Sequence, residues 1–257
     1  MNYEALSKDI SQWIKDYAKN ANLECLVVGV SGGIDSAVVS KLCANTGFKT
    51  CVLNIPIKSS KKNSDLSELH CTELLDKYDN VEYITVDATE CFVNFLKAIG
   101  IFGEESDLAN ANSKSRMRMM ILYYLATKNS GIVVGTGNKV EDFGVGFYTK
   151  YGDGGVDISP IADLSKTQVK ELAAYLNVSQ KILNAPPTDG LWEDSRTDES
   201  QIGASYEELE WAMNTQQNTN EMTKRQKEIF EIYHYFNKKN SHKMNSIPVF
   251  KIIGRKS

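Results

Sequence analysis

A glycine-rich turn ending in an aspartate is the part of the sequence best suited to chemistry. The run Gly29-Val30-Ser31-Gly32-Gly33-Ile34-Asp35-Ser36 contains two adjacent glycines, which allow backbone N–H groups to turn tightly around an anion. Ser31 and Ser36 can add hydroxyl hydrogen bonds to phosphate oxygens. A carboxylate at Asp35 would repel bare phosphate, so its presence predicts a Mg²⁺ ion between the two. These residues together predict a Mg²⁺-dependent phosphate-binding turn.

An ordinary strand-to-helix turn is the simpler alternative, because Gly-Gly pairs and Asp or Ser caps are common at such places. The combination of Ser31, Gly32, Gly33, Asp35 and Ser36 directly after a buried apolar run favours phosphate binding. The sequence contains no G-x-x-x-x-G-K-[ST] pattern, so a Walker-type γ-phosphate site is not predicted.

The segments that must position this turn have the periodicity of alternating strands and helices. Short apolar runs rich in β-branched residues predict buried strands at 23–30, 50–55, 81–86 and 132–135. Helical periodicity predicts an opening amphipathic helix and further helices at 36–46, 64–78, 88–98 and about 108–129. This alternation predicts an α/β fold, a doubly wound parallel sheet with helices on both faces. Such sheets bind ligands at the carboxyl ends of their strands, where the turn lies.

The composition excludes several classes of protein. The 257 residues are 42% hydrophobic and 24% charged, which is typical of a globular chain, and we expect a single domain over residues 1–257. The net charge of −4 argues against a general nucleic-acid or membrane-surface binder. Five cysteines without C-x-x-C spacing are expected as reduced thiols. With no signal peptide and no long apolar run predicted, we expect a cytoplasmic location.

The turn resembles the pyrophosphate-binding loop of the N-type ATP pyrophosphatases, which release pyrophosphate from ATP and adenylate an acceptor. The loop alone leaves GMP synthetase, argininosuccinate synthetase, asparagine synthetase, tRNA-thiolating enzymes and NAD synthetase as alternatives. Several later segments resemble NAD synthetase: 135–141, 146–157, 164–168, 185–188 and 241–243. The resemblance implies a Rossmann-like fold of the adenine nucleotide alpha hydrolase type. Because the turn begins at residue 29, we expect the ammonia-using form, without the amidase domain of glutamine-using members.

The sequence departs from the family pattern at one place. Many bacterial members read Thr-Asp-His-Ala-Ala-Glu where this chain has Thr136-Gly137-Asn138-Lys139-Val140-Glu141. Thr136 and Glu141 are retained, so the departure concerns only the contacts made by the residues between them.

The resemblance implies ATP-dependent amidation of deamido-NAD to NAD with ammonia. The nicotinate carboxylate attacks the α-phosphate of ATP, pyrophosphate leaves, and ammonia then displaces AMP from the adenylate. Negative charge builds up on phosphoryl and carbonyl oxygens in both steps, so the catalyst needs positioned cations and N–H donors. No protein nucleophile is required.

Roles for individual residues also follow from the resemblance. ATP is assigned to the turn Gly29, Val30, Ser31, Gly32, Gly33, Ile34, Asp35 and Ser36 and to Thr136, Lys166 and Thr188, and Mg²⁺ to Asp35 and Glu141. Deamido-NAD is assigned to Arg116, Lys150, Asp157, His242 and Lys243. Asp153 is expected near the nicotinate and ammonia, and Asp35, Asp153 and Lys166 are the expected catalytic residues. A solvent-exposed or purely structural side chain is the alternative at each position.

Lys166 is also unusual without the resemblance. It follows Ser165, and Ser165 with Gln168 forms the pattern of a helix capping box. A cation in the first turn of a helix opposes the helix dipole. This misfit favours a lysine that serves a bound phosphate.

Two segments are predicted to move: 184–204, expected as a lid over the adenylate, and the basic 58–63. Acidic residues gather in 189–210, and 224–257 holds nine Lys or Arg against two acids. The basic segment is predicted to bind the substrate's phosphates, and docking onto the acidic stretch is the alternative.

The resemblance implies a homodimer, for which Trp13, Ile14, Tyr17 and the Met- and Tyr-rich helix 116–125 would supply apolar surface. Two functions of other classes stay open: a tRNA-modifying adenylating enzyme and a non-catalytic nucleotide sensor. The net charge of −4 and the lack of a C-x-x-C pair argue against the first. The presence of Asp35, Glu141 and Lys150 argues against the second.

Overall fold

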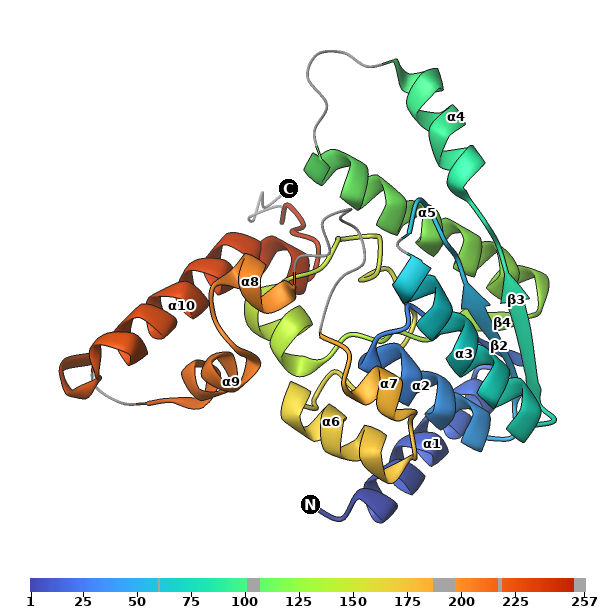
Figure 1. The fold of residues 1–257 in the computed structure, drawn as a ribbon, viewed down its shortest axis with the longest axis horizontal. Helices are drawn as coiled ribbons and strands as arrows, with labels where there is room; N and C mark the ends of the chain where they lie inside the picture. Colours follow the sequence, from blue (N-terminus) through green and yellow to red (C-terminus); the bar gives the residue numbers. More distant parts are fainter. Residues whose placement is uncertain (60, 101–106, 187–196, 217–218, 252–257) are drawn as a thin grey trace, which may run out of the picture.

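A parallel β-sheet lies among helices in the right half of the molecule as drawn in Figure 1. The computed structural model describes all residues except 60, 101–106, 187–196, 217–218 and 252–257. Its strands are β1 (Cys25–Gly29), β2 (Lys49–Asn54), β3 (Val81–Thr85) and β4 (Gly131–Val133), in the order β3-β2-β1-β4. All three strand pairs are parallel. The predicted doubly wound α/β fold is confirmed.

Helices cover both faces of the sheet because the side chains of β1 alternate between them. Leu26 and Val28 pack with α1 (Tyr3–Asn20), α2 (Ile34–Asn45) and α6 (Lys166–Tyr175), followed by the short α7 (Gln180–Leu183). Cys25 and Val27 pack on the other face with α4 (Thr89–Ile99) and α5 (Asp107–Lys128). The helix α3 (Lys61–Lys77) packs against Val52 of β2.

A further hydrophobic cluster lies outside the sheet, and the helices α9 and α10 that contribute to it lie at the left of Figure 1. It joins a π-helical segment η1 (Lys139–Val145) to α8 (Asp198–Ile202), α9 (Tyr206–Asn214) and α10 (Lys224–Met244), with a 3-10 turn η2 (Thr219–Glu221) before α10. Arg225 of α10 pairs with Glu208 of α9 at 2.8 Å, a contact of the kind expected if the basic segment docks on the acidic one. The capping box predicted at Ser165 is confirmed, and a second one, of Ser205 with Glu208, fixes the start of α9.

Some predicted boundaries differ from the structure. The helix α3 begins at Lys61, so half of the segment predicted to move at 58–63 is the first turn of a helix. The helix α8 lies inside the predicted lid 184–204, whose part 187–196 is outside the described residues. Ile14, predicted as dimer surface, is fully buried under α2. Among the described residues, no helix combines the length and apolar character needed to cross a membrane.

Candidate active site

A cavity of about 740 Å³ opens at the carboxyl ends of β1 and β4. The strand that follows β1 in the chain, β2, pairs with one edge of β1, and β4 pairs with its other edge. The crevice between two such strands is where open α/β sheets bind ligands, and the volume suits a small-molecule substrate. The cavity is lined by the turn Gly29–Ser36 and by these predicted site residues: Arg116, Thr136, Glu141, Lys150, Asp153, Lys166, His242 and Lys243.

The turn after β1 is held by its own serines. The Ser31 N–H donates to Ser36 Oγ at 3.2 Å, and the Gly33 N–H donates to Ser31 Oγ at 3.2 Å. Gly32 has a φ of +87°, which favours glycine at this position. No side chain caps α2 at Gly33, and the helix N-terminus lines the cavity. Uncapped N–H groups and the helix dipole favour an anion there.

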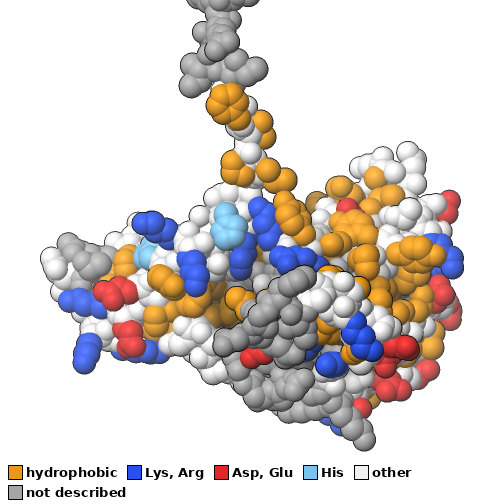
Figure 2. All heavy atoms as spheres, turned by 90° about the horizontal axis from the view of Figure 1, so that it is seen from above, with side chains coloured by type: hydrophobic (Ala, Val, Ile, Leu, Met, Phe, Trp, Pro, Cys, Tyr) orange, Lys and Arg blue, Asp and Glu red, His pale blue; other side chains and the backbone are white. Residues whose placement is uncertain are grey.

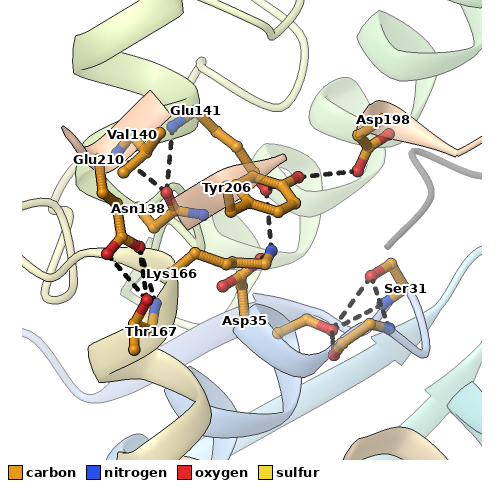
Figure 3. Close-up of polar contacts among 12 residues, drawn as sticks. Ser31, Asp35, Asn138, Val140, Glu141, Lys166, Thr167, Asp198, Tyr206 and Glu210 are labelled. Carbon is orange, nitrogen blue, oxygen red and sulfur yellow. Dashed lines mark hydrogen bonds and ion pairs between the residues drawn. The ribbon is translucent and has the colours of Figure 1, made fainter. Parts of the chain in front are cut away.

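Lys166 lies between two carboxylates at the floor of the cavity (Figure 3). Its Nζ donates to Asp35 Oδ2 at 2.5 Å and to Glu141 Oε1 at 2.8 Å, and the residue is only 3% exposed. The three residues come from α2, η1 and α6, so the fold rather than the local sequence brings them together. The two carboxylates hold the charge that is unfavourable at the start of α6. That Lys166 serves a bound phosphate stays a prediction.

Burial and mutual charge set the protonation of this group. Burial raises the pKa of Asp35 to about 6, with Glu141 adding to the rise and Lys166 opposing it. Burial also acts to raise the pKa of Glu141, but the charge and hydrogen bond of Lys166 outweigh it and lower that pKa. Burial acts against the Lys166 cation, yet the two carboxylates raise its pKa above the ordinary value. The ammonium is therefore charged at neutral pH.

The residues present fit a Mg²⁺ ion. Oδ1 of Asp35 is buried and has no hydrogen-bond partner among the described residues, so this oxygen can accept a ligand. Mg²⁺ is commonly bound by one or two carboxylates together with substrate phosphates. The described residues contain no group of three or more His, Cys, Asp or Glu that would form an all-protein metal site. Asp35 and Glu141 would therefore share the ion with phosphate oxygens.

Two side chains that contact Glu141 or its helix from behind the cavity were not predicted. Asn138 Oδ1 accepts the N–H groups of Val140 and Glu141 at 3.0 Å each, which fixes the start of η1. Its Nδ2 is buried and has no partner within the described ranges. Tyr206 of α9 donates its hydroxyl to Glu141. Asn138 acts locally, as the N-cap of η1, so its Asn type next to a helix start was the available signal. Tyr206 reaches Glu141 across 65 positions, which no local pattern reveals, although the capping box at Ser205 does predict the helix that carries it.

Asp142 is a further carboxylate of the cavity that the sequence did not indicate. A Cβ atom on Gly137 would lie 1.8 Å from Asp142 Oδ2, so the glycine leaves room for this carboxylate. Burial, followed by the charges of Asp153, Glu141 and Asp35, raises the pKa of Asp142 well above its ordinary value. The place where the sequence departs from the family pattern is thus the place where Asp142 enters the cavity.

Asp153 is held in a fixed orientation on the loop after η1. Its Oδ1 accepts the Ser115 hydroxyl at 2.6 Å and the Thr149 N–H at 3.1 Å, while its own N–H donates to Ser115 Oγ at 2.9 Å. A Cβ on Gly152 would lie 2.2 Å from Ser115 Oγ, so the glycine is needed for this approach. The carboxylate at 153 therefore has a defined place at the cavity wall.

Basic side chains at the other end of the cavity are bound to backbone carbonyls. Lys150 Nζ donates to the His242 carbonyl at 2.5 Å, and Arg116 Nε donates to the Lys150 carbonyl at 3.3 Å. Lys243 Nζ donates to the carbonyls of Gly146 and Tyr148 at 2.8 Å each. Figure 2 shows Lys and Arg side chains, with His beside them, gathered on the face seen in that view.

Within the part of the chain that the structure describes, Asp157 is the predicted site residue that is not brought to the cavity. The Asp157 carboxylate accepts the Val133 N–H at 2.8 Å and the Tyr123 hydroxyl at 3.0 Å, which ties its loop to the end of β4. It is absent from the described lining of the cavity, so its substrate role stays a prediction. Thr188 lies outside the described residues.

Comparison with known proteins adds to this geometry. The family model described as NAD synthase matches residues 6–247. The chain belongs to the NAD synthase family. It is 39% identical over 221 residues to an NH(3)-dependent NAD(+) synthetase of Finegoldia magna, covering 85% of this chain and 88% of the relative. A Methanococcus aeolicus protein of the same description is also 39% identical, with 82% of each chain covered.

Solved structures of the family have the same fold. An NMN synthetase from Francisella tularensis is 30% identical, with a TM-score of 0.88 over 98% of this chain and all of that one. An NH3-dependent NAD synthetase from Campylobacter jejuni, solved with a nitrate ion, is 25% identical, with a TM-score of 0.78 over the same shares. The Rossmann-like fold implied by the resemblance is therefore confirmed.

Proposed function

We propose that this protein amidates deamido-NAD to NAD with ammonia and ATP, releasing AMP and pyrophosphate. The observation that carries the proposal is the ion-paired group of Asp35, Lys166 and Glu141 beside the phosphate-binding turn. A cation held between two carboxylates next to an open helix N-terminus suits ATP that arrives with a metal ion. Membership of the NAD synthase family supports the choice of acceptor.

The residues of the turn and of α6 would act on the phosphates. The N-terminus of α2 and the turn Gly29–Ser36 would bind the pyrophosphate that leaves, and Lys166 would neutralise charge on the transferring phosphoryl group. Asp35 and Glu141 would hold Mg²⁺, which supplies charge neutralisation and orients the phosphates when bound. The charges set the order in which the groups would bind. Mg²⁺ would first neutralise Asp35 and Glu141, and Lys166 would then be free to contact a phosphate.

The residues of the opposite wall would act on the acceptor. Lys150, Lys243 and Arg116 would bind the two phosphates of the dinucleotide, because their charges face the cavity while backbone carbonyls hold their positions. Asp153, fixed by Ser115 and Thr149, would lie beside the nicotinate carboxyl group and the incoming ammonia. On the ATP side, Thr136 would contact ATP from the end of β4. Thr188 is likewise proposed to bind ATP.

The experiment is an acceptor comparison. The protein is incubated with ATP, Mg²⁺ and ammonium, and with deamido-NAD or bulk tRNA as acceptor, and AMP, pyrophosphate and NAD are quantified. We expect AMP, pyrophosphate and NAD in equal amounts with deamido-NAD, and no AMP with tRNA. AMP formation with tRNA alone would contradict the proposal and favour an RNA-adenylating enzyme.

A second candidate acceptor is nicotinate mononucleotide. It is favoured by one observation, the likeness to the Francisella tularensis NMN synthetase over nearly the whole chain. Both acceptors present the same nicotinate carboxylate, so the phosphate-binding end of the cavity serves either reaction. The ratio of kcat/KM for deamido-NAD and for the mononucleotide decides between them. We expect the dinucleotide to be preferred, because the chain is 39% identical to several NAD(+) synthetases.

We also propose a cytoplasmic homodimer. Trp13 and Tyr17 on α1 are 48% and 42% exposed, and Met120 and Tyr124 on α5 are 57% and 69% exposed. The two pairs lie on opposite faces of the sheet, and each pair exposes large apolar side chains of the kind found at interaction sites. Sedimentation at micromolar concentration should give about twice the 28.7 kDa of one chain. A monomer that retains full activity would contradict the dimer.

A further inference from the structure

Tyr206 contacts the phosphate-binding end of the cavity from behind. The residue is 1% exposed and does not line the cavity in the described part of the chain. Its hydroxyl donates to Glu141 Oε1 and lies 3.2 Å from Asp198 Oδ2, and its ring centroid lies 4.9 Å from Lys166 Nζ (Figure 3). One side chain therefore touches a proposed metal ligand, the site lysine and the first residue of α8.

The hydroxyl has one hydrogen to donate, and Glu141 receives it. Glu141 Oε1 accepts from Tyr206 and from Lys166 at the same time, so two donors from two helices fix one carboxylate oxygen. Burial and the neighbouring carboxylates raise the pKa of Tyr206, so the phenol stays protonated as a donor.

The same face of α9 also supports the helix that carries Lys166. Glu210 follows Tyr206 by four residues and therefore lies on the same side of the helix. It accepts the Thr167 N–H at 2.9 Å and the Thr167 hydroxyl at 2.8 Å. The capping box of Ser205 and Glu208 fixes where α9 begins. Tyr206 and Glu210 together hold η1 and the first turn of α6 in register.

We infer that Tyr206 is a positioning residue, which orients Glu141 for Mg²⁺ and keeps Lys166 between Asp35 and Glu141. The inference rests on the proposed role of Glu141 in holding the metal. Without the hydroxyl, Glu141 Oε1 loses one of the two donors that hold it, and it can turn with Lys166 away from the metal position. The loss falls on metal-dependent ATP binding, and the dinucleotide end of the cavity is unaffected.

The test is the Tyr206→Phe variant of the full chain, which removes the hydroxyl and keeps the ring over Lys166. Tyr233→Phe is the matched control, because Tyr233 is 8% exposed and packs in the same hydrophobic cluster. The readouts are calorimetric affinity for ATP as a function of Mg²⁺, without acceptor or ammonia, and the KM for deamido-NAD. We expect Tyr206→Phe to need about tenfold more Mg²⁺, the size of a lost hydrogen bond to a charged group. The KM for deamido-NAD should not change in either variant.

Two further variants separate this inference from the proposed function. Glu141→Gln should raise the Mg²⁺ requirement for ATP binding more than Tyr206→Phe does, and adding Tyr206→Phe to it should have no further effect. If Glu141→Gln leaves the Mg²⁺ dependence unchanged, the proposed metal role of Glu141 fails, and the inference fails with it. If Glu141→Gln behaves as expected while Tyr206→Phe matches the wild type or Tyr233→Phe, the inference alone is overturned. Measuring well below the melting temperatures of all variants excludes an effect of lost stability.

Discussion

The two ends of the cavity hold their lysines in different ways. At the end proposed to bind ATP, Lys166 is buried and bound by two carboxylates, so its charge is cancelled within the protein. At the acceptor end, Lys150 and Lys243 are bound by backbone carbonyls, which orient the cations without cancelling their charge. A phosphate can bind the second kind of lysine directly. A phosphate can bind Lys166 only when another cation neutralises Asp35 and Glu141. This requirement would couple ATP binding to the metal ion.

Removing the cation at the ATP end should have the largest effect. Lys166→Met leaves Asp35 and Glu141 as buried carboxylates without their cation, and breaking such a buried pair costs about 3–5 kcal/mol of unfolding free energy. Added Mg²⁺ should restore part of the loss, because the ion can now bind both carboxylates without competition. Denaturant unfolding with and without Mg²⁺ measures both effects.

Lys170→Met is the matched control for Lys166→Met. Lys170 lies on the same helix, pairs with Glu207 at 3.8 Å and is 46% exposed, so its loss should cost about 0–1 kcal/mol and show no Mg²⁺ effect. Equal stability of the two variants would contradict the buried ion-paired group.

Asp35→Asn tests the metal at the same end. The variant keeps the size of the side chain and one hydrogen-bond acceptor for Lys166, so it should fold, while AMP formation falls by about 10²–10³-fold, as when a transition-state contact is lost. Asp35 is only 16% exposed, so the substitution removes a buried charge. Asp163→Asn, at a side chain that is 94% exposed, is the control and should keep full activity. Near-normal AMP formation by Asp35→Asn would contradict the proposed role of Asp35 in holding Mg²⁺.

Lys243→Met tests the acceptor end. Lys243 holds the carbonyls of Gly146 and Tyr148, so its loss should loosen this wall and raise the KM for deamido-NAD about tenfold. The KM for ATP should stay the same if the two ends act separately. Lys227→Met, an exposed position earlier on α10, should change neither constant. If both KM values rise together in Lys243→Met, α10 is a general support and the comparison between the two ends fails.

The pH dependence gives the smallest effect. Burial raises the pKa of Asp35 from 3.8 to about 6, and the ionised form is the one that can hold Mg²⁺. Pyrophosphate release without ammonia should therefore fall below pH 6 by about tenfold per unit, since one proton blocks the site. Because this pKa is raised on folding, the contribution of Asp35 to stability is present below pH 3.8 and is lost as the pH rises through about 6.

Pyrophosphate release is the right measure for this pH profile, because the supply of free ammonia also changes with pH and would mask Asp35 in the full reaction. A flat rate between pH 5 and 7 would show that Asp35 is not the titrating group.

The phosphate-binding turn could be predicted because its signals are local. An apolar run gives β1, the glycines give the turn, and α2 begins at Ile34 within two residues of the prediction. The sequence also singles out Lys166 as a candidate site residue, because a cation in the first turn of a capped helix is unfavourable unless an anion lies beside it. Fold and turn both follow from neighbours in the chain.

The partners of those residues could not be predicted from the sequence. Tyr206 reaches Glu141 across 65 positions, and Lys166 reaches Asp35 across 131. The cavity also admits Asp142 only because Gly137 has no Cβ, a steric match that neither residue reveals alone. Asp157 shows the reverse case, since its side chain is engaged by β4 and α5 instead of the cavity.

The central claim is that this cavity joins ATP to a nicotinate carboxylate before ammonia arrives. The most direct measurement uses ATP labelled at the α-phosphate, Mg²⁺ and deamido-NAD, first without ammonia and then with ammonium added. We expect labelled adenylate on the dinucleotide, with one pyrophosphate released for each adenylate formed. AMP and NAD should follow once ammonium is present. Release of ADP and phosphate, or no transfer of the label to the acceptor, would contradict it.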